Sequence, residues 1–144
     1  MSDAIRFLLN GEAVEARGVP PTTTLLDWLR AERRLTGTKE GCAEGDCGAC
    51  AVAVREIGPD GRLRTLPVNA CIQLLPMMHG REVVTVEALA APDGRLHPVQ
   101  RAMAELHGSQ CGFCTPGFVM SLWVGARTGA DPAPASVCDL LAGN

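Results

Sequence analysis

Four cysteines carry the strongest chemical signal in this 144-residue sequence. Cys42, Cys47 and Cys50 stand in one loop as C-x4-C-x2-C, and Cys71 follows after a longer spacer. This is the ligand spacing of a plant-type [2Fe-2S] cluster, in which one tight loop supplies three thiolates and a distant element supplies the fourth. A zinc site is the alternative, but four-cysteine zinc sites usually pair two C-x2-C units. The spacing therefore predicts a complete [2Fe-2S] site.

The loop that holds the first three cysteines is rich in glycine. Its glycines are Gly37, Gly41, Gly45 and Gly48. Glycine lets the backbone wrap closely, so that N–H groups can point at sulfur and help to set the potential of a cluster. We expect Cys71 to lie in the first turn of a short helix that Asn69 caps and Pro76 ends, where the helix dipole favours a thiolate.

A second cysteine pair, Cys111 and Cys114, forms a C-x2-C motif directly before an apolar segment. Such a pair is either a redox dithiol or half of another metal site. The preceding segment has helical periodicity and no βαβ pattern surrounds the pair, which favours a metal site. Cys138 lies in the last predicted helix and is expected to pack in a core. The single histidines are expected at the surface or as caps: His79, His97 and His107.

Composition excludes several classes of protein. Hydrophobic residues make up 47% and charged residues 20%, and 13 Lys and Arg against 16 Asp and Glu give a net charge of −3. No basic run is present to follow a phosphate backbone, so nucleic acid is not an expected partner. The most apolar segment, 118–126, is shorter than the ~20 residues that span a membrane. An odd number of cysteines without a secretion leader favours a soluble, cytoplasmic protein that binds metal.

The first 90 residues are expected to form an α+β unit. Asn10-Gly11 predicts a hairpin, and Thr24 with Asp27 predicts the start of a helix. The full set of expected elements is strand 5–9, strand 13–16, a helix to about residue 34, the cysteine loop 37–50, strand 51–57, the short helix with Cys71, and strand 83–86. A hairpin followed by a helix begins a β-grasp, ferredoxin-like domain, which we place at residues 1–90.

The periodicity changes from strand to helix after the turn-rich segment 89–94. Pro98 suits the first turn of a helix that reaches about residue 107, and Thr115 is the expected cap of a buried helix that ends near residue 128. A last helix is expected at 136–141, capped by Ser136. Residues 91–144 are therefore predicted to form an all-α domain.

At this point the motifs resemble a known family. The segments GTKEGCAEGDCGAC, VNAC and HGSQCGFCTPGF together resemble the iron–sulfur portion of the molybdenum hydroxylases. LLNGEAVEA, VEALAAPDGRLHPVQRAM and DLLAGN are most similar to bacterial xanthine dehydrogenase small subunits. The resemblance implies a β-grasp ferredoxin-like domain with one [2Fe-2S] cluster, followed by an all-α domain with a second. It also implies that electrons pass from a purine substrate at a molybdenum–molybdopterin centre through both clusters to FAD and NAD.

The resemblance also assigns roles to residues. Cys42, Cys47, Cys50 and Cys71 would hold the FAD-side cluster, Cys111 and Cys114 half of the molybdenum-side cluster, and Gln110 would contact the pterin. The expected partners are a molybdenum-binding large subunit and an FAD domain or subunit. The chain would be part of an oxidoreductase complex of purine catabolism and would have no catalytic residue of its own.

This sequence differs from the family pattern at its C-terminus. In the family, a C-R-C pair follows the segment that matches 140–144 and supplies two more ligands, so the resemblance implies a truncated chain and an incomplete helical domain. Three alternatives stay open. These are an iron–sulfur subunit of an aldehyde or carbon monoxide oxidising member, a stand-alone ferredoxin, and a thiol–disulfide regulator that uses Cys111 and Cys114.

Overall fold

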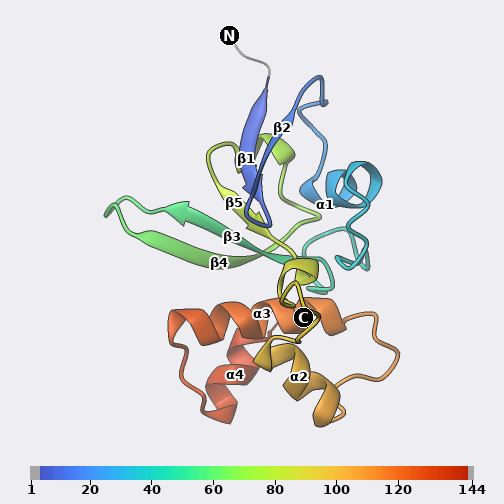
Figure 1. The fold of residues 1–144 in the computed structure, drawn as a ribbon, viewed down its shortest axis with the longest axis vertical. Helices are drawn as coiled ribbons and strands as arrows, with labels where there is room; N and C mark the ends of the chain where they lie inside the picture. Colours follow the sequence, from blue (N-terminus) through green and yellow to red (C-terminus); the bar gives the residue numbers. More distant parts are fainter. Residues whose placement is uncertain (1–3, 143–144) are drawn as a thin grey trace.

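The computed structural model describes residues 4–142, which form a mixed β-sheet followed by a group of helices (Figure 1). The sheet has five strands in the order β2-β1-β5-β3-β4. The strands are β1 (Ile5–Leu9), β2 (Glu12–Ala16), β3 (Ala51–Ile57), β4 (Leu63–Asn69) and β5 (Glu82–Val84). The helical elements are α1 (Leu25–Asp27), a π-helical turn (Trp28–Glu32), 3-10 turns (Leu75–Met78 and Val86–Ala88), α2 (Pro98–Glu105), α3 (Thr115–Thr128) and α4 (Pro134–Leu140).

The N-terminal hairpin follows from two residues in its turn. Asn10 and Gly11 have φ angles of 53° and 84°, as a tight hairpin turn of this kind requires, and β1 then pairs antiparallel with β2. β1 also pairs parallel with β5, which returns from the far end of the first unit. This arrangement confirms the predicted α+β fold, with a β-grasp ferredoxin-like sheet followed by helices.

Strand β3 is buried on both faces, and its alternating side chains enter two cores. Val52 and Val54 point into a core that also holds Leu25 of α1 and Leu29 of the π-helical turn after it. Ala51 and Ala53 point to the other face and belong to a second core with residues of α3. Because alanine has a short side chain, helix α3 can lie close against the strand.

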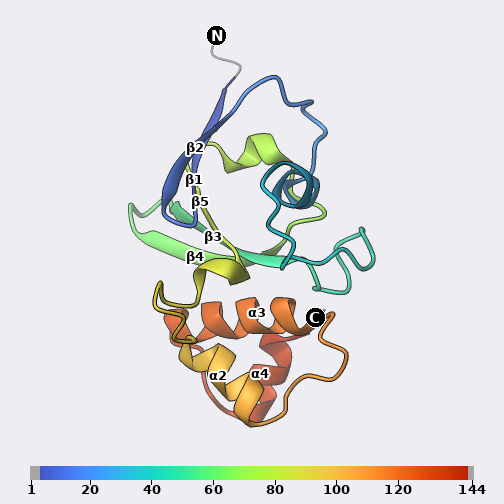
Figure 2. The same ribbon diagram turned by 45° about the vertical axis from the view of Figure 1, so that its right-hand side comes forward.

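Helix α3 joins the helical part of the chain to the sheet. Figure 2 shows it lying between the sheet and the pair formed by α2 and α4. Its buried side chains on this side are Val119, Met120, Trp123 and Val124. Burial of side chains of this size contributes roughly 1.5–3 kcal/mol each relative to full exposure. At Gly125 an added Cβ would collide with Leu140, so the glycine lets α4 approach α3.

Some of the helix caps in the structure are those predicted from the sequence. Thr24 accepts a hydrogen bond from the N–H of Asp27 at 3.0 Å, as predicted, although the helix continues as a π-helical turn. His97 caps α2 through a capping box, and His79 and His107 are exposed, so the histidine predictions are confirmed. Two predicted caps are wrong. Ser136 lies within α4, because that helix begins at Pro134 after Ala133. Thr115 is the first residue of α3 and not its cap, because Cys114 occupies the N-cap position.

Two further expectations are wrong, and one strand was missed. The segment around Cys71 is a turn after β4 and not a helix, because Asn69 pairs with Ala51 at the end of the sheet. Strand β4 itself was not expected, and its Pro67 is tolerated because β4 is an edge strand. Cys138 is exposed on α4 and does not pack in a core.

Helix α4 ends at Leu140, one residue before the predicted end. The implied truncation concerns Asn144, which lies outside the described residues. The predicted boundary after residue 90 stays a prediction. Among residues 4–142, no helix is both long enough and apolar enough to cross a membrane.

Candidate metal centres

The entrance of the cysteine loop is fastened by two side chains from elsewhere in the chain. Nη1 of Arg30 donates to the carbonyl oxygens of Thr36 and Thr38, at 3.1 and 2.8 Å. The N–H of Gly37 donates to Oε1 of Glu87 at 2.8 Å. Neither contact was predicted from the sequence. Glu87 lies fifty positions from Gly37, so no local pattern could have pointed to it.

The sulfur of Cys42 is surrounded by backbone N–H groups of its own loop. It accepts hydrogen bonds from Glu44, Asp46 and Cys47 at 3.4, 3.3 and 3.3 Å. These bonds, with that from Cys47 the largest effect, lower the pKa of Cys42 to about 6. The loop can wrap in this way because Ala43 and Gly45 adopt positive φ angles of 58° and 84°. The expectation that loop amides point at sulfur therefore holds at Cys42.

Cys47 lies against the same loop from the other side. Its sulfur accepts a hydrogen bond from the N–H of Cys42 at 3.4 Å. A Cβ added at Gly41 would lie 2.7 Å from the Cys47 sulfur, well inside van der Waals contact. Gly41 is therefore needed here because its missing side chain leaves the room that the sulfur occupies.

Cys50 and Cys71 are buried beneath the loop. Burial raises the pKa of Cys71 to about 12, and a hydrogen bond between its thiol and that of Cys50 adds to this effect. The N–H of Gly45 bonds to the Cys71 sulfur and opposes the shift. The expected helix dipole does not act on Cys71, because no helix begins there. Metal binding at Cys71 has to displace a proton from this neutral thiol.

The structure brings these four cysteines to one end of the sheet, three from the loop and one from the turn after β4. In the present side-chain arrangement, no group of three or more His, Cys, Asp or Glu residues within 4–142 is placed to hold a metal ion. The fit to a [2Fe-2S] cluster therefore rests on the donors, which are four thiols in the required order and amides directed at sulfur.

The second cysteine pair lies at the start of α3. Cys111 and Cys114 are both exposed, and Cys114 occupies the N-cap position. Gln110, which precedes the pair, is also exposed. The hydroxyl groups of Ser109 and Thr115 are 2.7 Å apart and close the turn by a hydrogen bond. Two exposed thiols on a fixed turn can supply two ligands to a cluster.

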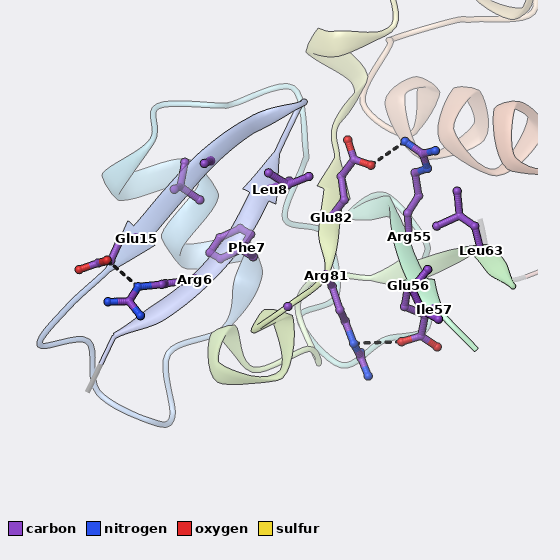
Figure 3. A pocket seen from close by; sticks show the side chains of 13 residues that line it. Arg6, Phe7, Leu8, Glu15, Arg55, Glu56, Ile57, Leu63, Arg81 and Glu82 are labelled. Carbon is purple, nitrogen blue, oxygen red and sulfur yellow. Dashed lines mark hydrogen bonds and ion pairs between the residues drawn. The ribbon is translucent and has the colours of Figure 1, made fainter. Parts of the chain in front are cut away.

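The open face of the sheet holds a groove of about 530 Å³ away from all seven cysteines (Figure 3). Apolar side chains of β1, β3 and β4 line it, and an ion pair between Arg55 and Glu82 at 2.6 Å crosses it. None of the predicted site residues lies in this groove.

Family matches follow the order of the two cysteine motifs. Residues 7–72 match the family described as "2Fe-2S iron-sulfur cluster binding domain", and residues 85–144 match "[2Fe-2S] binding domain". Fold and matches together define an iron–sulfur protein with two [2Fe-2S]-binding domains in tandem.

Comparison with named proteins narrows the class of iron–sulfur protein to which this chain is similar. The solved quinoline 2-oxidoreductase from Pseudomonas putida 86 superimposes with a TM-score of 0.85 and 30% identity, over 98% of this chain and 80% of that chain. The aldehyde oxidoreductase from Desulfovibrio desulfuricans gives a TM-score of 0.80 and 36% identity, over 96% of this chain and 14% of that chain. Aldehyde oxidase 4 of Cavia porcellus is 44% identical over 144 residues, which is 99% of this chain and 11% of the relative.

The chain belongs to the molybdenum hydroxylase family and corresponds to its iron–sulfur part. It spans about a tenth of the length of the curated relatives that it matches, with 11% of Aldehyde oxidase 4 as an example.

Proposed function

We propose that this chain is the electron-transfer part of a molybdenum hydroxylase and carries electrons from a molybdenum centre toward FAD. The observation that carries the proposal is the first cysteine site. There, Cys42 accepts three backbone hydrogen bonds in the same loop as Cys47 and Cys50, and Cys71 lies against Cys50. A bound [2Fe-2S] cluster supplies the one-electron chemistry that such a relay requires.

Each of the two domains, 1–90 and 91–144, would supply ligands to one cluster. In the first, the N–H groups around Cys42 stabilise negative charge on sulfur, which favours the thiolate that a metal requires. In the second, Cys111 and Cys114 supply two of the four thiolates of another cluster, and Gln110 contacts the pterin. The partners are then a molybdenum–molybdopterin subunit or domain and an FAD domain or subunit. Thiolates that bind iron persist in a reducing compartment, which supports a cytoplasmic location.

The class of substrate is proposed from the relatives. Several relatives with high identity over nearly the whole chain are aldehyde oxidases, and one solved neighbour is an aldehyde oxidoreductase. They favour the aldehyde-oxidising alternative over the xanthine dehydrogenase that the sequence segments suggested. A quinoline-oxidising relative shares the fold, so xanthine and other heterocycles remain as the second candidate class.

The test is to purify the chain with the molybdenum subunit that accompanies it and to follow the visible absorption of the [2Fe-2S] cluster. If the proposal is right, an aldehyde bleaches this absorption anaerobically, while xanthine bleaches it slowly or not at all. Bleaching by xanthine alone would select the alternative substrate class. A chain that carries its cluster but copurifies with no molybdenum subunit would be a stand-alone ferredoxin, and the proposed role would be wrong.

A further inference from the structure

Phe113 belongs to the second cysteine motif, yet its ring reaches the first cysteine loop. Phe113 lies between Cys111 and Cys114 in the sequence. A Cβ added at Gly41 would lie 3.8 Å from Cε1 of Phe113 and 2.7 Å from the sulfur of Cys47. The ring edge and the sulfur are therefore neighbours of the same glycine, one from each domain.

The turn that presents this ring is fixed. Gly112 adopts a φ angle of 86°, and the bond between Ser109 and Thr115 closes the turn. Phe113 remains 47% exposed, so its other side faces solvent. An apolar ring beside Gly41 and Cys47 occupies space that water would otherwise fill.

We propose that Phe113 is a positioning residue that joins the two cysteine loops and shields the Cys47 side of the first cluster from water. The inference rests on the proposed function, because it concerns the potential of that cluster. The apolar shell around a metal site controls solvent access, and solvent exposure is one determinant of a cluster's potential. Water stabilises the more negative, reduced state, so docking of the helical domain keeps the potential of the first cluster low.

The experiment uses the full 144-residue chain with the first cluster assembled anaerobically and reduced by dithionite. The midpoint potential is measured by a redox titration in which the electron paramagnetic resonance signal of the reduced cluster is followed. The titration is done for the wild type, Phe113→Ala, Phe113→Leu and the control Leu106→Ala. Leu106 follows α2 and is 79% exposed. We expect a positive shift for Phe113→Ala, a smaller one for Phe113→Leu, and none for Leu106→Ala. Equal potentials for Phe113→Ala and Leu106→Ala would overturn the inference.

A second measurement decides the case in which a variant does not assemble its cluster. In the metal-free chain, Phe113→Ala should raise the rate at which N-ethylmaleimide modifies Cys47 several-fold, while the rate at Cys71 stays the same. An unchanged rate at Cys47 would show that the ring does not cover the loop. Failure of the wild-type chain to bind any cluster would instead count against the proposed function and leave the maleimide comparison to decide this inference.

Discussion

The side-chain amide of Asn69 donates a hydrogen bond of 2.7 Å to the carbonyl oxygen of Gly45. It ties the end of β4, two residues before Cys71, to the middle of the cysteine loop. The same glycine donates its N–H to the sulfur of Cys71. Gly45 is thus held by both of its backbone groups, and the loop is fixed over the fourth cysteine.

We predict that Asn69→Ala shortens the lifetime of the first cluster, because the loop loses its link to β4. The lost hydrogen bond should also cost about 1 kcal/mol of unfolding free energy. The control is Gln100→Ala, which removes the capping hydrogen bond to the N–H of His97 at 3.0 Å, far from the loop. Iron release to a chelator and chemical denaturation measure the two effects. The prediction fails if both variants release iron at the wild-type rate.

Gly41→Ala should prevent assembly of the first cluster, because the added Cβ would lie 2.7 Å from the sulfur of Cys47. The control is Gly94→Ala, at a glycine with a φ of 84° and no atom within 4 Å of an added Cβ. That variant should lose about 1–2 kcal/mol of stability through backbone strain and still bind the cluster. Iron content after anaerobic reconstitution separates the two. Normal iron content in Gly41→Ala would contradict the prediction.

Cys42 and Cys71, whose pKa values are shifted in opposite directions, should differ in reactivity in the metal-free chain. Cys42 has a pKa of about 6 and is mostly thiolate at neutral pH, whereas Cys71 has a pKa of about 12 and stays protonated. Because the thiolate is the reactive form, alkylation of Cys42 by iodoacetamide should slow as the pH falls through about 6. Alkylation of Cys71 should be slow over the whole neutral range. Mass spectrometry of the labelled peptides measures both rates, and equal rates at neutral pH would contradict the assignment.

Glu87→Ala should loosen the entrance of the cysteine loop, because Gly37 loses the acceptor for its N–H at 2.8 Å. Hydrogen exchange at the Gly37 amide should then become faster by about tenfold, the factor that corresponds to ~1.4 kcal/mol. Glu87→Gln keeps a carbonyl oxygen in the same place and should exchange nearly as slowly as the wild type. If Gln behaves like Ala, the carboxylate charge and not the hydrogen bond fastens the loop.

Features set by neighbouring residues could be predicted from the sequence. The Asn10-Gly11 turn, the Thr24 cap, strand β3 and helix α3 each depend on side chains within a few positions. The grouping of Cys42, Cys47 and Cys50 is of the same kind, because one loop supplies all three. For these elements the local pattern and the tertiary structure agree.

Features that depend on contacts between distant parts of the chain could not be predicted from the sequence. Strand β4 is largely exposed and lacks a regular apolar alternation, so only its pairing with β3 makes it a strand. That pairing also removes the helix expected at Cys71 and leaves the thiol buried beside Cys50. The contact between Glu87 and Gly37 crosses fifty positions, and the reach of Phe113 to Gly41 crosses from one domain to the other.

The central claim is that Cys42, Cys47, Cys50 and Cys71 hold a [2Fe-2S] cluster. Its most direct test is the electron paramagnetic resonance spectrum of the dithionite-reduced chain after anaerobic reconstitution, with iron and sulfide analysis. We predict a rhombic signal and about two iron and two sulfide per complete site. The signal should be lost in Cys47→Ser and kept in Cys138→Ser. A chain that binds only zinc, or a signal that survives Cys47→Ser, would contradict it.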